Sequence, residues 1–241
     1  MKNFYQSLII LTFFSACSNE GDLSIDDTDA THSTYHSKSP EIPANTDNDY
    51  DIAGQIHNEI LAAYCESTPQ PTTLEGVMGL LEAKTTANPN FFFIKELTYT
   101  PPFGDRVLHI ANLKGDAIDE VINGSGLSTI AKTSFNLFVT SLLRQVATQE
   151  NYQPIYDFIV GYEAQVKANP VFSSKDKEVI LITTSIARHS VYLKKKRPKK
   201  NTDPDWDWMT GNIMGGTDGA SSGTAEAISM ALAVGIFENI K

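Results

Sequence analysis

Two polar pairs inside apolar helical patterns are the residues of this sequence best suited to chemistry. His57 and Asn58 form the first pair, and Arg188 and His189 form the second, with Ser190 next to it. An imidazole can exchange a proton near neutral pH, and a guanidinium binds carboxylates and other anions. If His57, Asn58, Arg188 and Ser190 converged, they could bind an anion or a carboxylate. We therefore treat them as a candidate polar cluster.

A structural role is the alternative for both pairs. A histidine on an apolar helix is often a hydrogen-bonded part of the interior. Arg188 stands among expected core positions, where a buried charge requires an opposite charge nearby. Glu59 and Asp157 are acidic residues of the expected folded body that could supply that charge. Both interpretations remain open on sequence grounds.

The sequence has no Walker loop, no HExxH and no paired CxxC, and Gly124-Ser125-Gly126 lacks the spacing of a nucleophile elbow, so we interpret it as a turn. Asp203, Asp205 and Asp207 alternate as calcium ligands can. An EF-hand loop counted from Asp203 would need Gly and Glu where Trp208 and Met214 stand. We interpret the three acids as a helix start, and we predict no metal site and no cofactor.

The first sixteen residues have the layout of a secretory signal peptide. Lys2 supplies a positive charge, residues 8–14 are mostly apolar, and two small residues precede Cys17. The apolar run is shorter than the roughly 20 residues that a membrane-spanning helix needs. The segment Phe14-Ser15-Ala16-Cys17 resembles the lipobox of bacterial lipoproteins, with Phe where that family usually has Leu.

This resemblance implies cleavage before Cys17, a thioether-linked diacylglycerol on its sulfur and acylation of the new amino terminus, for example with palmitate. Several acyl chains together anchor a protein firmly to a membrane. Because Ser18 rather than an aspartate follows the cysteine, the outer membrane is favoured. An ordinary signal peptide followed by a coincidental cysteine is the alternative.

Residues 17–49 are predicted to be the lipidated cysteine and a disordered acidic tether. From residue 18 this stretch holds eight acidic residues and only Lys38 as a base. A segment with so few apolar residues cannot offset the entropy lost on ordering, and its like charges extend it. His32 and His36 lie here and are interpreted as solvated. The early acidic residues resemble the surface-export tethers of Bacteroidetes lipoproteins.

Composition limits the classes of partner and of cysteine chemistry. The net charge of −10 argues against binding to a phosphate backbone, so no nucleic-acid partner is expected. Cys17 and Cys65 are the only cysteines, so acylation of the first excludes a disulfide framework. Cys65 falls in an apolar helical pattern, which predicts a buried, inert thiol. A reactive nucleophile is the alternative.

Residues 50–241 are predicted to form one mainly α-helical, bundle-like domain of about six to eight helices. Apolar residues recur there at helical spacing, between capping residues and breakers such as proline. Asp51 is predicted to cap the first helix. Helices are expected over residues 52–64, 74–87, 104–112, 116–122, 127–148, 154–168 and 174–191, with a further helical tail.

Two segments interrupt this pattern. Residues 91–94, Phe-Phe-Phe-Ile, are predicted to be a strand or an extended core segment. Residues 194–200 carry six positive charges around Pro198. They are interpreted as a helix end and loop, with a docking patch for an acidic partner, a lipid-headgroup site or a protease-sensitive linker as alternatives.

The tail carries small residues at every fourth position, namely Gly211, Gly215, Gly219, Gly223, Ala227, Ala231 and Gly235. On a helix this spacing makes a groove in which another backbone can approach closely. We predict a buried, tightly packed tail with a break near residues 215–216 or 221–222. A membrane-active or mobile segment is the alternative.

Three scattered motifs resemble a group of small uncharacterised Bacteroidetes secreted proteins and lipoproteins. They are Tyr50-Asp51…Gly54…His57-Asn58, Ser185-Ile186-Ala187-Arg188…Ser190…Tyr192 and Asp218-Gly219-Ala220. The resemblance spans residues 50–241 and implies that the three regions share one domain. It implies no activity.

The leading hypothesis is an outer-membrane lipoprotein that acts as a non-enzymatic envelope interaction module. It would be anchored through Cys17 and would bind a protein or glycan partner, with exposure at the cell surface as one arrangement of the anchored protein. The predicted anchor, the long tether and the missing catalytic motifs lead to this hypothesis. The alternatives are a hydrolase or ligand-binding enzyme that uses His57 and Arg188, and a membrane-active C-terminal segment.

Overall fold

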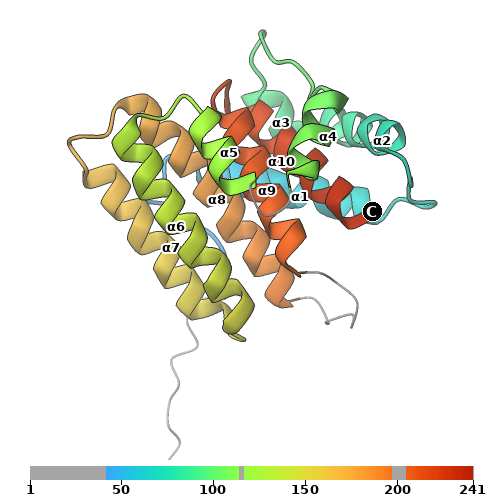
Figure 1. Cartoon of the computed structure of the whole chain (residues 1–241). Helices are drawn as coiled ribbons and strands as arrows, with labels where there is room; N and C mark the ends of the chain where they lie inside the picture. The colour runs from blue at the N-terminus through green and yellow to red at the C-terminus, as the bar shows by residue number, and fades with distance from the viewer. Residues whose placement is uncertain (1–41, 114–116, 197–204, 241) are drawn as a thin grey trace, which may run out of the picture. The chain divides into compact units, whose positions relative to one another are not determined.

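Ten helices make up the regular structure in the computed structural model, which describes residues 42–113, 117–196 and 205–240 (Figure 1). They are α1 (Asp51–Cys65), α2 (Leu74–Ala87), α3 (Pro89–Ile94), α4 (Gly104–Asn112), α5 (Ala117–Gly124), α6 (Thr129–Thr148), α7 (Tyr152–Ala168), α8 (Ser174–Lys196), α9 (Asp205–Ala220) and α10 (Thr224–Ile240). All ten belong to one compact unit, and these ranges contain no strand. The prediction of a single, mainly α-helical domain is confirmed. The six to eight expected helices become ten because α3 is an additional helix and the tail forms two.

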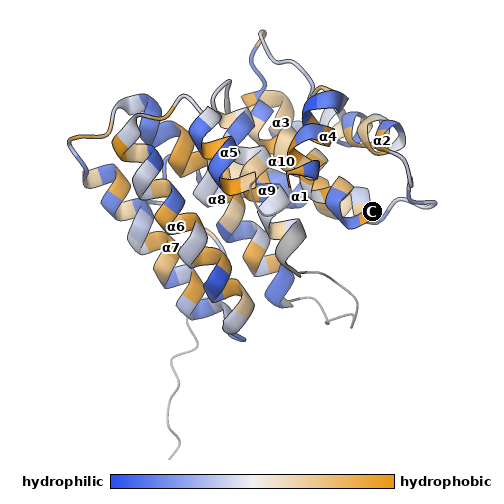
Figure 2. Ribbon diagram, viewed as in Figure 1, coloured by the Kyte–Doolittle hydropathy of each residue, from blue (hydrophilic) through white to orange (hydrophobic). Residues whose placement is uncertain are grey.

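The centre of the fold is built from α8, α9 and α10. Every residue from Val179 to Val191 of α8 is buried, as is every residue of α10 from Ala227 to Ile236. Helix α7 packs on α8 and α6 packs on α7, whereas α2, α3 and α4 contact α10 (Figure 1). On α6 and α7 hydrophobic and hydrophilic residues alternate along the helix, as an amphipathic outer helix requires (Figure 2).

Small residues bring α9 and α10 into backbone contact. A Cβ atom added to Gly215 would lie 2.4 Å from the backbone oxygen of Met230, and one added to Gly219 would lie 2.4 Å from that of Glu226. The chain reverses after Ala220, so the two halves of the small-residue stripe face each other. The predicted close packing and the break at residues 221–222 are confirmed.

Residues 91–94 belong to helix α3, so the prediction of a strand or an extended segment was wrong. The side chain of Asn88 accepts a hydrogen bond from the backbone N–H of Phe91 at 2.8 Å, and Pro89 takes the first helical position. This start signal outweighs the β-propensity of three consecutive phenylalanines.

Asp51 does not cap α1, which was a second wrong prediction. The N-cap is Tyr50, whose side chain makes no capping hydrogen bond, and Asp51 is the first helical residue. Its carboxylate turns instead towards Arg188, at 2.6 Å from Nη2. A buried guanidinium is a stronger partner for a carboxylate than a backbone N–H at a helix start.

The packed body begins before Tyr50, earlier than the predicted tether boundary. Asn45 and Asn48 are only 8% and 3% exposed, and both donate hydrogen bonds to Glu163. Residues 42–49 are therefore part of the folded body. Cys17, His32 and His36 lie outside the described residues.

Cys65 is exposed, so the prediction of a buried thiol was wrong. The buried stripe of α1 ends with Leu61 and Tyr64. One residue later the helix has rotated by about 100°, which carries Cys65 off that stripe.

A lysine at the start of the basic run, residues 194–200, binds the C-terminal end of helix α6. Lys195 Nζ donates to the backbone oxygens of Val146 and Gln149 at 3.0 and 2.6 Å, and so binds the C-terminal carbonyls of α6. This contact agrees with the interpretation of residues 194–196 as a helix end. Residues 197–200 lie beyond the part of the chain that the structure describes.

Candidate functional site

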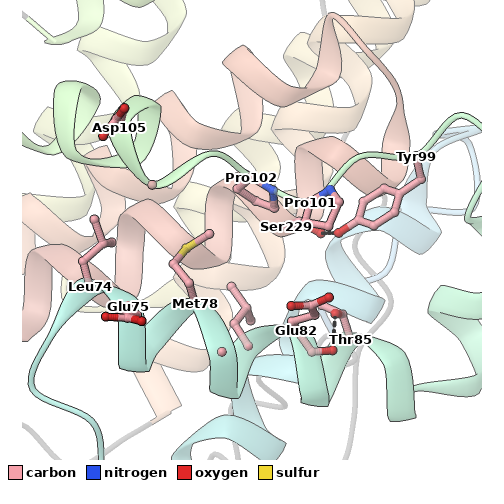
Figure 3. Close-up of a pocket in the computed structure, with 13 residues that line it drawn as sticks. Leu74, Glu75, Met78, Glu82, Thr85, Tyr99, Pro101, Pro102, Asp105 and Ser229 are labelled. Atoms are coloured by element: carbon pink, nitrogen blue, oxygen red, sulfur yellow. Dashed lines mark hydrogen bonds between the residues drawn. The ribbon is translucent and has the colours of Figure 1, made fainter.

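A groove of about 480 Å³ lies between α2 and the segment that joins α3 to α4. Its apolar lining is formed by Leu74, Met78, Leu81, Tyr99, Pro101 and Pro102. Met78 rises from α2 towards Pro102 on the opposite wall (Figure 3). The size and the apolar lining are those of sites that take a small molecule or a few side chains of a peptide.

The wall opposite α2 is fixed to the core by side chains. The hydroxyl of Tyr99 lies 2.9 Å from Ser229 Oγ on the buried helix α10, and its ring packs edge-on against Phe91 with 5.4 Å between centroids. Arg106 of α4 binds Asp218 of α9 at 2.5 Å. Because both walls rest on the central helices, the groove is already open in the structure.

Negative charge surrounds the groove. Glu75, Glu82 and Asp105 are exposed, and they lie among the thirteen described residues that line it. None of those thirteen residues is basic. The groove therefore combines an apolar interior with an acidic margin, which favours a ligand that carries positive charge.

Four large apolar side chains between residues 92 and 103 are the most exposed of their kind in the described part of the chain. Phe92, Phe93, Leu97 and Phe103 are 71%, 84%, 107% and 72% exposed, whereas the next is Leu137 at 66%. All four lie within twelve residues, on α3 and the segment that follows it. Figure 2 shows the hydrophobic colour of α3. We call these four residues the exposed apolar set.

Sequence reasoning missed this set. The sequence predicts a strand or an extended core segment over residues 91–94, and its patterns single out neither Leu97 nor Phe103. The available signal was the run of apolar residues beside Pro101 and Pro102, where no helical period could bury them all.

The predicted polar cluster does come together, between α1 and α8. Asn58 Nδ2 donates to the backbone oxygen of His189 at 2.8 Å, and Asn58 Oδ1 lies 3.2 Å from His57 Nδ1. Ser190 Oγ accepts a hydrogen bond from Asn212 at 3.2 Å. The expected pairs thus sit in one interface, each bound to another residue of the protein.

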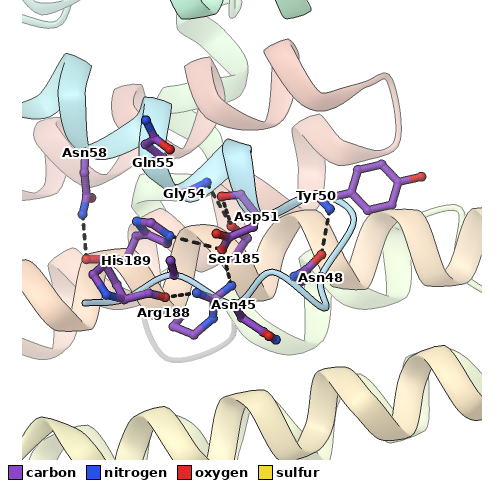
Figure 4. A network of polar contacts seen from close by, with 12 residues as sticks. Asn45, Asn48, Tyr50, Asp51, Gly54, Gln55, Asn58, Ser185, Arg188 and His189 are labelled. Atoms are coloured by element: carbon purple, nitrogen blue, oxygen red, sulfur yellow. Dashed lines mark hydrogen bonds and ion pairs between the residues drawn. The ribbon is translucent and has the colours of Figure 1, made fainter. Parts of the chain in front are cut away.

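Arg188 is fully buried and its guanidinium is surrounded by acceptors (Figure 4). Nη2 lies 2.6 Å from Asp51 Oδ1, and both Nε and Nη2 lie 3.4 Å from Glu163 Oε1. Nη1 donates to the backbone oxygen of Pro43. With two carboxylates and a carbonyl bound, the guanidinium serves the protein itself rather than an outside anion.

The expected partners of Arg188 were wrong. Glu59 accepts hydrogen bonds from Gln55, Asn88 and Asn90, and Asp157 accepts one from Gln153. Both acids lie on other helix faces than the one that meets Arg188. The real partners, Asp51 and Glu163, stand 137 and 25 residues away in sequence.

Glu163 ties the start of the folded body to α7 and α8. Its Oε2 accepts from Asn45 at 2.6 Å and its Oε1 from Asn48 at 2.9 Å. Asn48 also donates to the backbone oxygen of Leu181 at 3.0 Å. These contacts satisfy a carboxylate that is only 1% exposed and hold residues 45–48 against the core.

A second set of contacts joins α1 to α8 at close range. The backbone N–H of Gly54 donates to Ser185 Oγ at 3.0 Å, and this hydroxyl donates to the backbone oxygen of Asp51 at 2.9 Å. A Cβ atom added to Gly54 would lie 2.4 Å from the backbone oxygen of Ser185. The glycine is therefore required by the close approach of the two helices.

The pKa values in this interface follow from burial and pairing. Burial alone would raise the pKa of Asp51, but hydrogen bonds from His189 and Arg188 outweigh burial and lower it. Burial lowers the pKa of His189, and its contact with Asp51 only partly opposes this. Asp51 is thus the charged partner of Arg188 over the neutral range.

His57 is completely enclosed. Burial lowers its pKa to about 4, against the opposing influence of the contact with Asn58. Its Nε2 is buried and makes no hydrogen bond with the residues that the structure describes. An imidazole that is neutral at pH 7 and sealed from solvent is a packing residue, so we interpret the cluster as structural.

No family model, no curated protein and no solved structure matches this chain. Within the described ranges, no group of three or more His, Cys, Asp or Glu side chains is placed to hold a metal ion. None of the described helices has both the length and the apolar character needed to cross a bilayer. The geometry of the groove and of the polar cluster therefore has to carry any functional conclusion.

Proposed function

We propose that this protein is a non-enzymatic binding module of the cell envelope that captures a protein partner. The partner contacts the exposed apolar set and the neighbouring groove. Acyl chains on Cys17 hold the module at the outer membrane, and the residues between Cys17 and the body act as its tether.

The exposed apolar set is the observation that carries this proposal. Four large apolar side chains, each more than 70% exposed, lie within twelve residues, whereas the other exposed ones in the described part of the chain are less exposed and scattered over several elements. Apolar surface concentrated at one place marks an interaction site more often than a scattered distribution does. Aromatic anchors such as Phe92 and Phe93 are also typical of the centres of protein interfaces.

A protein partner fits this surface better than a glycan. The four side chains offer no polar atom, whereas every sugar hydroxyl that is buried on binding requires a hydrogen-bond partner. Apolar side chains of a protein meet no such requirement. The surface therefore gains more from a protein partner, through removal of apolar area from water.

The two alternatives have less support. A hydrolase would need His57 and Arg188 to reach a substrate, yet both are fully buried and Arg188 is bound to two carboxylates. A membrane-active tail would need the apolar face of α10 to leave the core, where residues 227–236 are all buried.

Site-specific photocrosslinking in cells tests the proposal. A photoreactive phenylalanine analogue replaces Phe93 in the full-length, membrane-anchored protein, and Leu137, which is 66% exposed on α6, is the control position. We expect one recurrent protein adduct from position 93 and none from position 137. Equal adducts at both positions, or no protein adduct at position 93, would contradict a binding surface on α3.

The anchor has its own test. Cys17→Ser removes the sulfur that would carry the diacylglycerol. We expect the protein to move from the membrane fraction to the soluble fraction while its circular dichroism spectrum stays unchanged. Unaltered membrane fractionation would reject lipidation at Cys17.

A further inference from the structure

Gly79 of α2 lines the groove, and the space next to it is empty. A Cβ atom added to Gly79 would meet no atom within 4 Å, so no packing contact requires a glycine there. A glycine in the middle of a helix is less stable than an alanine. Gly79 nevertheless lies in the groove lining, where any side chain would occupy the open space.

The carboxylates at the margin of the groove indicate the charge of the ligand. Glu75 and Glu82 each stand one position along α2 after an apolar lining residue, Leu74 and Leu81, and Asp105 lies on the opposite wall in the first turn of α4. A ligand that places an apolar group among Leu74, Met78 and Pro102 therefore passes close to carboxylates. Positively charged groups beside that apolar group would pair with them.

We propose that the groove binds a peptide segment in which an apolar side chain is flanked by lysine or arginine. The apolar side chain occupies the space above Gly79 between α2 and the Pro101–Pro102 wall. The flanking cation pairs with Glu75, Glu82 or Asp105. This inference rests on the proposed binding function and specifies the chemistry of the segment that is bound.

A peptide accounts for the site better than a lipid bilayer does. A bilayer surface is flat, and anionic headgroups would be repelled by three carboxylates that no basic residue of the described lining offsets. An extended peptide can enter a groove and present an apolar and a charged side chain in sequence. Charge complementarity thus commits the groove to a cationic, apolar segment.

The decisive variant is Gly79→Leu, which fills the groove and leaves its walls in place. Its matched control is Gly161→Leu. Gly161 lies on an exposed position of α7, and an added Cβ atom there also meets nothing within 4 Å. Both substitutions improve helix propensity equally, so only the position relative to the groove differs.

The probe is a phage-displayed library of random dodecapeptides, panned on the purified full chain. We expect enriched sequences to pair Leu, Ile or Phe with neighbouring Lys or Arg. A synthetic peptide of the enriched sequence should bind Gly79→Leu about ten- to a hundredfold more weakly than wild type, because the apolar anchor loses its site. Binding to Gly161→Leu should equal that of wild type.

Neutralising the margin tests the charge. Glu82→Gln should weaken binding of the same peptide about two- to fivefold and reduce its salt dependence, as expected for one exposed ion pair. Enriched peptides without basic residues, or equal binding to wild type and Gly79→Leu, would overturn the proposal. So would flotation with phosphatidylcholine and phosphatidylglycerol vesicles that Gly79→Leu abolishes, because the groove would then serve lipid.

The outcomes separate this inference from the proposed function. If Gly79→Leu keeps the cellular adduct at position 93 but peptide binding shows no dependence on the groove, the module stands and the groove inference fails. If the adduct at position 93 is absent while the selected peptide binds the groove, the surface proposed for the cellular partner is wrong and the peptide site stands.

Discussion

Helix α8 buries thirteen consecutive residues from Val179 to Val191, whereas α3 buries only Phe91 of its six. The buried stretch of α8 contains Arg188 and His189, the kinds of residue that usually suggest chemistry. The exposed part of α3 contains phenylalanines, which usually suggest a core. The contrast shows that burial in this protein does not follow residue type alone, because an arginine and a histidine lie in the interior while phenylalanines lie on the surface.

The reason lies in the cost of each arrangement. A buried arginine is stable only when charges and hydrogen bonds surround it, which leaves it with nothing to offer a ligand. An exposed phenylalanine is unfavourable in the free protein and gains when a partner covers it. Residue type alone therefore does not identify a functional region, and the burial of a residue has to be known before a role is assigned.

The largest expected effect comes from breaking the interior. Arg188→Met should lower the free energy of unfolding by about 3–5 kcal/mol, because Glu163 would remain buried without its positive partner. The control, Arg106→Met, removes a partly exposed ion pair with Asp218 and should cost about 1 kcal/mol or less. Urea denaturation followed by circular dichroism measures both. Equal losses of unfolding free energy would mean that the buried contacts of Arg188 stabilise the fold no more than the partly exposed pair of Arg106 and Asp218.

A smaller effect should appear as a dependence of stability on pH. The folded-state pKa of His57 is lowered from 6.5 to about 4, so the unfolded chain takes up a proton first as the pH falls. The contribution of neutral His57 to the free energy of unfolding is fully present well above pH 6.5. The free energy of unfolding should fall by about 2 kcal/mol between pH 7 and pH 5. His189, whose pKa is also lowered, adds a loss of the same sign.

Urea denaturation at several pH values in this window measures the slope, and His57→Gln should reduce it. The lowered pKa values of Asp51 and Glu59 matter only below their usual ranges near pH 4, so they do not contribute above pH 5. A slope that is unchanged in His57→Gln would show that His57 is not the neutral, enclosed residue described above.

The smallest expected effect concerns the exposed phenylalanines of α3. Phe93→Ala should change the free energy of unfolding by less than about 0.5 kcal/mol, because its side chain is 84% exposed. Phe91→Ala, two positions earlier, should cost about 3 kcal/mol or more, since Phe91 is buried against Tyr99. Thermal unfolding of the two variants provides the check. Similar losses would place Phe93 in the core.

Local sequence patterns predicted much of the fold. The period of apolar residues located most helices, and the small-residue stripe that includes Gly215 and Gly219 predicted a close backbone approach, which the structure shows between α9 and α10. Such signals lie within one helix or between neighbouring ones, where spacing along the chain determines which faces meet. The prediction failed at α3, where the local cap at Asn88 outweighed the strand propensity of the phenylalanines.

Contacts between segments far apart in the chain could not be predicted from the sequence. The pairing of Arg188 with Asp51 and Glu163, and of Glu163 with Asn45, depends on how α1, α7 and α8 cross, which no local period encodes. The groove requires α2, the 99–105 segment and Ser229 of α10 to meet at one place. For the same reason the sequence could list His57 and Arg188 as candidates but could not show that both are enclosed.

The position of α10 at the centre of the core has a consequence for biosynthesis. Helices α1, α2, α4, α8 and α9 all pack against α10, which occupies residues 224–240. Before that segment has been synthesised, these five helices lack one of the surfaces on which they pack. The apolar faces that α10 covers in the folded protein are then open to water, and such transiently exposed surfaces promote aggregation or binding by chaperones.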